Sequence, residues 1–493
     1  MLGTFDPAYS GHRASVYNVD AGLASAARMN PCKYIHHKVR CGGVSLNDFQ
    51  DREQWASRTG FILATVGSAV GLGNVWRFPT IVARSGGGAF LLLYLVIVLG
   101  VGIPLMMSEL AMGRRSQRGV VGAFRDLSPG TGWWGAGLVA PLAVFLIASY
   151  YSVIAGWTLI FTLLSAAGGL SGLGSDGLTE LFAHLTVDTL LPVYGLGAFL
   201  ILASVIVFYG VSTGIERWGR VLTPGIVVLL LVLLGRVLLL EGGLEGAVWF
   251  LTPNLADMSF DVALDALGQV FFSFSLGMGA VLTYGSYLSR SDDIPVNSLI
   301  ISLADVGIAI LAGLVVISAL FAFGIEAEAG FGLVFIALPA VFNTLPGAVF
   351  WSTVFFLSLS FAAMTSVISF LEVLNAVLIE EMGWSRPRAV VIVGVTCFFA
   401  GIPSALSEGL MRHVRILGWD IMGFTDMLAS NLLLPLSGLL TTVFVAWIWG
   451  TRAAGAEVFL GVHRSGAIPL WSFIMRYIAP LALTYILIAG LLS

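Results

Sequence analysis

Charged residues are scarce in this chain. Only 11% of its 493 residues are Asp, Glu, Lys or Arg, whereas 58% are hydrophobic. A water-exposed surface needs roughly a quarter charged residues, so this composition excludes a soluble globular protein. The composition therefore predicts a polytopic membrane protein embedded in a lipid bilayer.

Cysteine and the common catalytic motifs are also scarce or missing. Three cysteines, with Cys397 inside an apolar run, exclude a disulfide framework. Cys32, His36, His37 and Cys41 have no common zinc spacing, so we expect no transition-metal site. The chain lacks a GxxxxGK[ST] loop, so we expect no ATP use. It also lacks the HExxH and GxSxG motifs, so we expect no enzymatic activity. We expect no nucleic-acid partner.

Long apolar runs dominate the sequence after residue 50. A helix needs about 20 apolar residues to cross the hydrocarbon core. By this measure the sequence predicts eleven spans, at residues 57–82, 86–112, 132–166, 190–210, 219–240, 262–288, 297–324, 347–380, 388–405, 424–449 and 469–491. Residues 1–50 are polar and are predicted to form a disordered cytosolic tail; the alternative is a start codon assigned too early.

The distribution of arginine predicts the orientation of these spans. One set of loops contains Arg114, Arg115, Arg118, Arg125, Arg217, Arg220, Arg290, Arg386, Arg388, Arg452 and Arg464. The alternate set contains Arg412 and Arg415. Because basic loops stay in the cytoplasm, we expect a cytoplasmic N-terminus and an extracytoplasmic C-terminus in a plasma or inner membrane.

Two predicted spans contain stretches that a plain membrane helix would not have. Residues 67–79 read GSAVGLGNVWRFP, and residues 271–287 read FFSFSLGMGAVLTYGSY. Glycine lowers helix stability by about 1 kcal/mol per residue, and unwound backbone in lipid needs polar partners. One interpretation is close helix packing through small residues. The other is a pair of broken helices that bind ions and a polar solute.

The positions of the breaks, in the first and sixth spans, favour the second interpretation. They divide the chain into two five-span halves that enter the membrane from opposite sides, an arrangement typical of transporters. We expect an all-α polytopic membrane protein with a 5+5 inverted repeat and a binding site between the breaks. The predicted divisions are 1–50 for the tail, 51–240 and 241–449 for the repeats, and 450–493 for the eleventh span and its preceding loop.

Several motifs carry a family resemblance. The stretches REQWASRTGFILATVGSAVGLGNVWRFP, GGGAFLLLYLVIVLGVGIPLMMSELAMGRR, FFSFSLGMG and FAAMTSVISF resemble the neurotransmitter:sodium symporter family, which has the LeuT-like fold. The similarity runs from about Arg52 to the end of the tenth span. The predicted number of spans, eleven instead of twelve, is similar to that of several bacterial members of the family.

The resemblance implies two sodium sites. One comprises the Ala69 carbonyl and the Asn74, Ser273 and Asp305 side chains. The other comprises the carbonyls of Gly67, Val70 and Ala362 with the hydroxyls of Thr365 and Ser366. Neutral oxygens suit sodium, although hydroxyls on a helix also commonly bond to their own backbone.

Asp305 departs from the family pattern, because many relatives have Asn at this position. An unpaired carboxylate in the membrane is costly, so we expect a cation or a proton to accompany it. Chloride-dependent relatives have Ser one turn later, where this chain has Ala309. We therefore expect transport without chloride.

The resemblance also implies the class of substrate. Monoamine carriers have Asp where this chain has Gly71, so a substrate with its own carboxylate is expected, bound by the free N–H groups of the first break and by the Tyr151 hydroxyl. The other expected pocket residues are mostly apolar, which favours a hydrophobic amino acid. The predicted substrate set is Ser68, Ala69, Gly71, Leu72, Gly73, Ile147, Tyr151, Phe272, Ser273, Ser275, Met278, Ser366 and Phe370, with Ile154 nearby.

Two gates are expected from the same resemblance. Arg77 and Asp426 match an outer pair above the lid residues Tyr151 and Phe272. Arg52 and Trp55 match an inner gate, with Glu380 at the position of their partner. Exposed charges of this kind are otherwise solvated and worth under about 1 kcal/mol.

The expected function is secondary active symport of a hydrophobic amino acid with two sodium ions, by alternating access and without an enzymatic step. The alternatives are an amino-acid-binding membrane sensor and a channel-like protein without concentrative transport. The sequence leaves the oligomeric state open.

Overall fold

The computed structural model describes residues 53–324, 330–461 and 466–492, together with three short strands near the N-terminus. The chain divides into two compact units, Met1–Arg52 and Glu53–Ser493. In the first unit, β1 (Lys33–Ile35), β2 (Lys38–Cys41) and β3 (Val44–Ser45) form an antiparallel sheet in that order.

The rest of the predicted tail lies outside the described residues. This holds for the potential ligands Cys32, His36 and His37 and for Arg52, the expected inner-gate residue. The sheet occupies part of the tail that is predicted to be disordered.

The second unit is helical, and short π- or 3₁₀-helical segments (η) continue several of its α-helices. The segments up to residue 251 are α2 (Arg58–Ala69), η2 (Gly73–Arg77), α3 (Phe78–Arg84), α4 (Gly88–Ile97), η3 (Val98–Gly102), α5 (Ile103–Ser116), α6 (Val120–Leu127), η4 (Gly132–Leu138), α7 (Val139–Ala166), α8 (Ser175–Val187), α9 (Leu191–Phe208), η5 (Val211–Glu216), α10 (Arg217–Val237) and α11 (Gly243–Leu251).

The later segments follow the same pattern. They are η6 (Leu255–Asp257), α12 (Phe260–Ser273), α13 (Ala280–Gly285), α14 (Ile294–Phe323), η7 (Leu333–Ala337), α15 (Leu338–Asn343), α16 (Ala348–Met382), α17 (Arg386–Ala405), α18 (Ile421–Asp426), η8 (Met427–Leu433), α19 (Leu434–Val443), η9 (Phe444–Ile448), α20 (Thr451–Val458), α21 (Ala467–Phe473), η10 (Ile474–Ile478) and α22 (Ala479–Leu492).

Most of these segments combine into membrane spans. Among the described residues, nine helices are long and apolar enough to cross a membrane, and α2 with α3 makes a tenth that is bent by 56° at its break. In the place of the predicted sixth span lie α12 and α13, each too short to cross a bilayer alone. The chain is therefore an integral membrane protein.

Backbone conformation explains where the two spans break. α2 ends at Ala69, and Val70 has an extended backbone with ψ of 91°. After α12 ends, Ser275, Gly277 and Gly279 have φ values of 51°, 74° and 72°. Because a right-handed helix requires negative φ at every residue, it cannot continue through these positive values.

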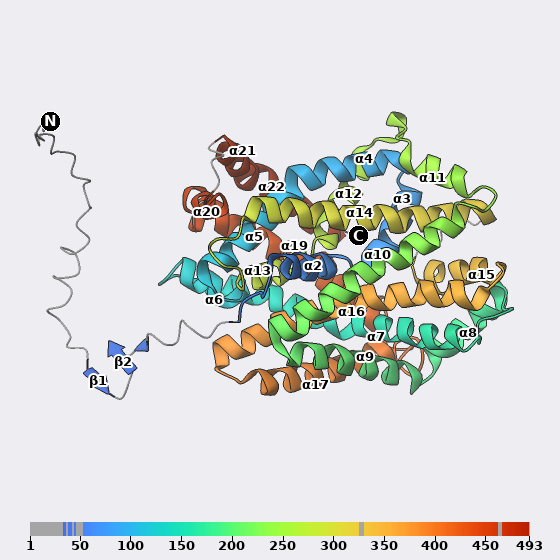
Figure 1. The fold of residues 1–493 in the computed structure, drawn as a ribbon, viewed down its shortest axis with the longest axis horizontal. Coiled ribbons are helices and arrows are strands. Elements are labelled where there is room, and N and C mark those ends of the chain that lie inside the picture. Colours follow the sequence, from blue (N-terminus) through green and yellow to red (C-terminus); the bar gives the residue numbers. More distant parts are fainter. Residues whose placement is uncertain are drawn as a thin grey trace, which may run out of the picture. The chain divides into compact units, whose positions relative to one another are not determined.

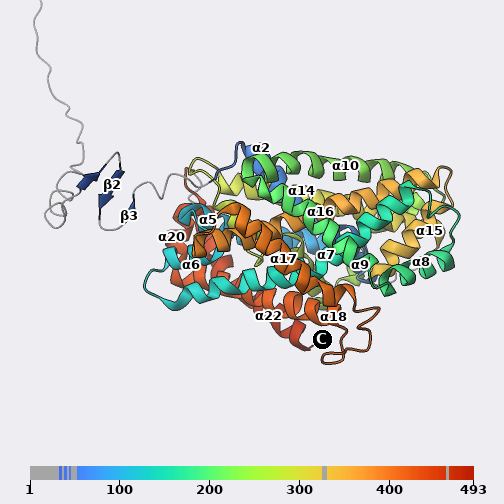
Figure 2. The ribbon, with the colours of Figure 1, turned by 90° about the horizontal axis from the view of Figure 1, so that it is seen from below.

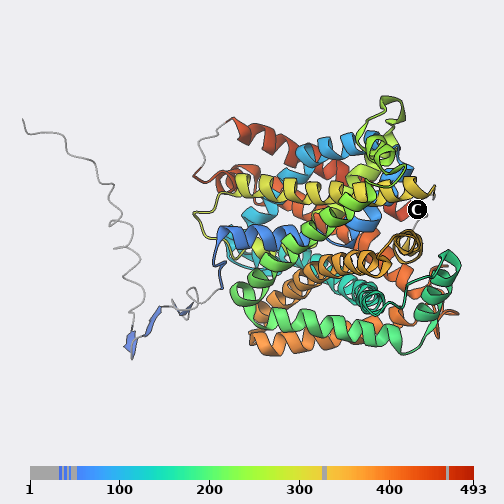
Figure 3. The ribbon, with the colours of Figure 1, turned by 45° about the vertical axis from the view of Figure 1, so that its right-hand side comes forward.

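The long helices pack around these breaks. α16 lies along α7, and α7, α9 and α17 pack against one another (Figures 1 and 2). Figure 3 shows the green α9 beside the orange α17. α2 contacts α10, α14 and α16, while α13 contacts α5 and α16. Both broken spans are thus enclosed by continuous helices, which supply partners for the unwound backbone.

Candidate functional site

A buried polar cluster joins the two broken spans to α14. Asn74 Nδ2 donates to Asp305 Oδ1 at 2.8 Å. Ser273 Oγ lies 2.8 Å from Asp305 Oδ2 and 3.1 Å from Asn74 Oδ1. All three side chains are at most 1% exposed. Three of the four members of the first predicted sodium site are therefore in mutual contact.

Two polar residues beside this cluster were not selected from the sequence. Tyr94 on α4 lies close to Asp305 and Ser273. Gln269 lies one turn before Ser273 on α12, is fully buried, and neither of its side-chain amide atoms has a partner within the described structure. In the sequence, Tyr94 and Gln269 are recognisable only as polar residues within apolar spans. No neighbouring residue indicates that they lie near Asp305.

The second predicted sodium site lies where α2 meets α16. Thr365 Oγ1 is 2.9 Å from the Ala362 carbonyl and 3.4 Å from the Val70 carbonyl. A Cβ atom at Gly67 would lie 3.0 Å from Thr365 Cγ2, so only glycine allows this approach. The hydroxyl thus bonds to its own helix, as hydroxyls commonly do, and also faces the carbonyl of the first break.

A small central cavity of about 20 Å³ lies between the breaks. Ser275 Oγ donates to the Ser68 carbonyl across it at 3.1 Å. The cavity is lined by Ser68, Ala69, Gly71, Gly73, Asn74, Ile147, Tyr151, Phe272, Ser273, Ser275, Met278, Ser366 and Phe370. The structure brings together every member of the predicted substrate set except Leu72, which lines the larger outer cavity together with Ile154.

Tyr151 connects the central cavity to the unwound backbone. Its hydroxyl accepts a hydrogen bond from the Leu72 N–H at 2.9 Å, and its ring meets Phe370 edge to face with centroids 5.6 Å apart. A Cβ atom at Gly71 would lie 3.0 Å from this hydroxyl and 2.7 Å from Ser366 Oγ. The first break therefore approaches two hydroxyls as closely as glycine permits.

An outer cavity of about 490 Å³ lies next to the central one, and Tyr151 and Phe272 line both. Arg77 and Asp426 line the outer cavity, and the Arg77 guanidinium lies 4.6 Å from the centre of the Phe272 ring. No ion pair among the described residues joins Arg77 to Asp426.

Asp426 is held by residues that sequence reasoning missed. Its Oδ1 atom accepts from the Tyr150 hydroxyl at 2.6 Å and from Ser430 Oγ at 2.7 Å. Tyr150 directly precedes Tyr151 in the chain, and Ser430 lies one turn after Asp426, but nothing local in the sequence indicates that Tyr150 and Asp426 are in contact.

The expected inner-gate residues contact different elements. Trp55 Nε1 donates to the Tyr284 carbonyl at 3.0 Å, and its ring meets Tyr284 and Tyr287 edge to face. Glu380 accepts from the Gly119 N–H through both carboxylate oxygens, at 2.9 and 2.8 Å.

A group of ion pairs near the expected inner gate was not predicted from the sequence. Arg386 Nη1 is 2.8 Å from Glu372 Oε2, and Arg386 Nε is 3.0 Å from Glu53 Oε1. The Tyr287 hydroxyl donates to Glu372 Oε1 at 2.6 Å. These bonds tie the segment before α2 and the segment after α13 to α16 and α17.

One further carboxylate supports the second break. Glu109 Oε1 on α5 accepts from the Gly277 N–H at 2.7 Å, and the side chain is 2% exposed. A buried carboxylate thus satisfies backbone that the helix break leaves without an internal partner.

Two broken helices that enclose neutral oxygens, one carboxylate and a small cavity define a membrane carrier for ions and a small polar solute. A model of the sodium:neurotransmitter symporter family matches residues 52–171 and 191–493, so the chain belongs to this family and is a sodium-coupled transporter. The expected symport function and use of sodium are confirmed at this level.

Individual relatives agree with this membership. An uncharacterized sodium-dependent transporter of Bacillus subtilis, YhdH, is 35% identical over 446 residues, which are 89% of this chain and 98% of the relative. The sodium-dependent serotonin transporter of Drosophila melanogaster is 28% identical over 496 residues, covering 90% of this chain and 77% of the relative.

A solved structure confirms the predicted fold. The crystal structure of MhsT in complex with L-phenylalanine superposes with a TM-score of 0.82 at 40% identity, and the match covers 89% of this chain and 100% of MhsT. The LeuT-like inverted-repeat fold, with the first and sixth spans unwound, is therefore established for this chain.

Proposed function

We propose that this transporter takes up a hydrophobic amino acid together with two sodium ions, and does so without chloride. The observation that carries the proposal is the central cavity, which Tyr151 and the first break share with neutral polar and apolar side chains and which no charged side chain lines. Once this cavity of about 20 Å³ widens, a substrate carboxylate meets backbone N–H groups and the Tyr151 hydroxyl, and an apolar side chain meets Ile147, Met278 and Phe370.

Two features support the choice of an apolar substrate. Basic or acidic side chains would be buried without a counter-ion in this cavity, which is strongly unfavourable. MhsT, which shares 40% of its residues with this chain, binds L-phenylalanine. Met278 adapts to different shapes, so aromatic and branched amino acids both fit the proposal.

The cluster of Asn74, Ser273 and Asp305 supports transport without chloride. Asp305 places a negative charge beside the proposed sodium site, and Ala309, one turn later on α14, is fully buried and has no hydroxyl. A carboxylate therefore supplies the charge that a bound chloride would otherwise provide.

The proposed cycle uses the two cavities in turn. With the N-terminus in the cytoplasm, as the arginine distribution predicts, the outer cavity faces the exterior. Bound substrate is first covered by the lid of Tyr151 and Phe272 and by the pair of Arg77 and Asp426. The contacts of Trp55 and Glu380 then break, and the inner side opens. Residues 51–240 and 241–449 act as the two repeats in this proposal.

Uptake of labelled amino acids by proteoliposomes tests this function. We expect concentrative uptake of at least one hydrophobic amino acid with an inward sodium gradient, unchanged when gluconate replaces chloride. Binding without accumulation, from protein shown to be folded and inserted, would favour a sensor. Sodium-independent equilibration would favour a channel-like protein, and uptake only in chloride would refute the role of Asp305.

A further inference from the structure

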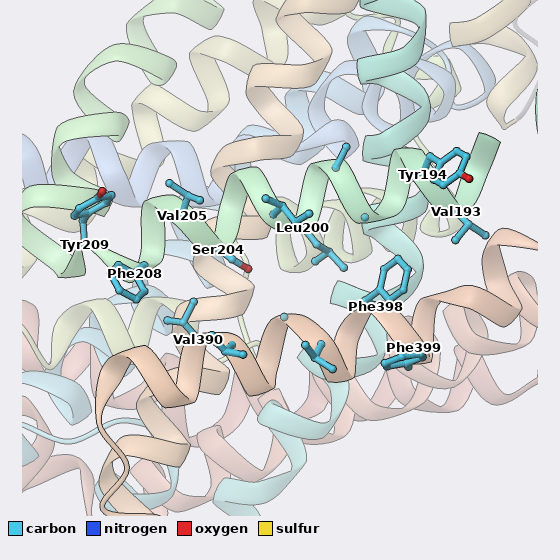
Figure 4. Close-up of a pocket in the computed structure, with 16 residues that line it drawn as sticks. Val193, Tyr194, Leu200, Ser204, Val205, Phe208, Tyr209, Val390, Phe398 and Phe399 are labelled. Carbon is cyan, nitrogen blue, oxygen red and sulfur yellow. The ribbon is translucent and has the colours of Figure 1, made fainter. Parts of the chain in front are cut away.

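An apolar groove lies between α9 and α17, and none of the residues that line it also lines the central or the outer cavity (Figure 4). Its volume is about 890 Å³. The floor forms where the two helices touch: a Cβ atom at Gly394 would lie 3.0 Å from Ser204 Oγ, and one at Gly197 would lie 3.1 Å from the Phe398 ring. Small residues thus keep the helices close and leave a shallow channel above them.

Large apolar side chains form the two rims of this α9–α17 groove. Ile201 and Val205 stand on the α9 rim, and Val391 and Phe399 stand on the α17 rim. Ile201 is 65% exposed and Phe399 is 64% exposed. Because α9 and α17 are both membrane-spanning helices, these rims face hydrocarbon, and the natural occupant of the channel is an apolar chain.

A positive charge lies at one end of the groove. Arg386 Nη1 donates to the Val207 carbonyl at 3.1 Å and so bridges the start of α17 and the end of α9. Arg388 is exposed three residues before Val391, and its guanidinium lies 4.3 Å from the centre of the Trp384 ring. No ion pair among the described residues involves Arg388.

We propose that the α9–α17 groove is a binding site for an anionic phospholipid. One acyl chain lies along the channel, and the lipid phosphate contacts Arg388. An arginine without a carboxylate partner binds phosphate oxygens in a bidentate manner, and basic residues at cytoplasmic helix ends attract anionic lipids. The site is separate from the transport cavities and does not depend on the substrate proposed above.

Charge complementarity favours a lipid over a second copy of the chain. In a two-fold symmetric dimer the same surface patch meets itself. Neither α9 nor α17 contains Asp or Glu, and the partly exposed Glu53 at this end is already paired with Arg386, so the same face of a partner copy would offer Arg388 no unpaired carboxylate. The phosphate of an anionic lipid supplies this missing charge.

Native mass spectrometry of the full chain tests the proposal, with phosphatidylglycerol and phosphatidylcholine supplied in equal amounts. We expect preferential retention of phosphatidylglycerol. Arg388→Gln removes the charge and should lower this retention about fivefold, since one arginine near a membrane surface contributes roughly 1 kcal/mol. Val395→Trp fills the channel from its rim and should lower retention of both lipids.

Two matched controls accompany these variants. Arg217→Gln removes another exposed arginine outside the groove, and Val228→Trp enlarges a 58% exposed side chain on α10. Both should retain phosphatidylglycerol like the unmodified protein. Equal retention of the two lipids by the unmodified chain, or no effect of Val395→Trp, would overturn the proposal.

A photo-crosslinking amino acid at Val205 identifies the occupant directly and does not depend on the other variants folding well. In membranes that contain phosphatidylglycerol, we expect an adduct with the mass of that lipid. A crosslinked dimer without a lipid adduct would instead assign the groove to a second copy and would refute the lipid site.

Discussion

Asp305 is the residue whose chemistry matters most for the proposed coupling. Its carboxylate is fully buried in a membrane helix and accepts from Asn74 and Ser273. No ion pair among the described residues involves it. Two neutral donors do not offset the cost of a buried charge, so the ionised form needs a bound cation.

Asp305→Asn tests this role. Removing the charge should raise the sodium concentration for half-maximal uptake about tenfold in gluconate, which corresponds to roughly 1.4 kcal/mol. Chloride should partly restore the sodium response, because an anion beside the site replaces the lost charge. The measurement is the sodium dependence of uptake in chloride and in gluconate.

Asp265→Asn is a suitable control, since Asp265 accepts from Ser85 Oγ at 2.9 Å and is not part of the cluster. It should leave both sodium curves unchanged. If Asp305→Asn left both curves unchanged as well, Asp305 would not be a sodium ligand.

At the scale of elements, the two helix breaks decide the chemistry of the site. Each break exposes backbone groups that other helices then bind: Tyr151 on α7 accepts from Leu72, and Glu109 on α5 accepts from Gly277. Ser275 has a left-handed φ of 51° without being glycine, and its hydroxyl bonds to Ser68 of the other break. The breaks are therefore held in place by their surroundings and by each other.

Gly71→Ala tests how closely the first break must approach its neighbours. The added methyl group would lie 2.7 Å from Ser366 Oγ and 3.0 Å from the Tyr151 hydroxyl. We expect substrate binding to weaken by at least about fivefold, because overpacking typically costs about 1–3 kcal/mol. Equilibrium binding of the substrate identified in the uptake assay measures this effect.

Gly268→Ala on α12 is the matched change, because a Cβ atom there would meet nothing within 4 Å. It should bind substrate normally. Equal affinities for the two variants would mean that the first break does not contact the substrate as proposed.

At the scale of the whole molecule, a cavity lies on the outer side of the lid residues Tyr151 and Phe272, whereas the inner side is closed by side-chain contacts. The outer cavity reaches Arg77 and Asp426 without an ion pair between them. On the opposite side, Trp55 packs on Tyr284, and Arg386 binds both Glu53 and Glu372. In the proposed cycle both sides change, so we expect the outer cavity to close when substrate and sodium bind.

A single cysteine at Ile81, which lines the outer cavity, tests this closure in a chain whose three cysteines are replaced. Sodium together with substrate should slow its reaction with a membrane-impermeant maleimide about tenfold, equivalent to a shift of roughly 1.4 kcal/mol toward the closed state. The labelling rate at saturating ligand is the measurement.

Leu410→Cys provides the reference, because Leu410 is 62% exposed and does not line the cavity. Its labelling rate should not respond to ligand. The same rate at Ile81→Cys with and without ligand would contradict closure by alternating access.

The sequence by itself determined the spans and the two breaks, because these depend on local properties. Runs of apolar residues set the length of each span, and Gly71, Gly73, Gly277 and Gly279 weaken the helix where they stand. Family resemblance added most of the cavity lining, since its motifs lie at the breaks and on the helices that face them.

Only the tertiary structure decided which polar groups meet. Ser273 and Asn74 are 199 positions apart, and Arg386 and Glu53 are 333 apart, so no local pattern relates them. The same holds for the α9–α17 groove, which exists because Gly394 and Gly197 let two helices touch. Contacts of this kind arise from the packing of distant helices, whereas helix length and helix breaks arise from neighbours in the chain.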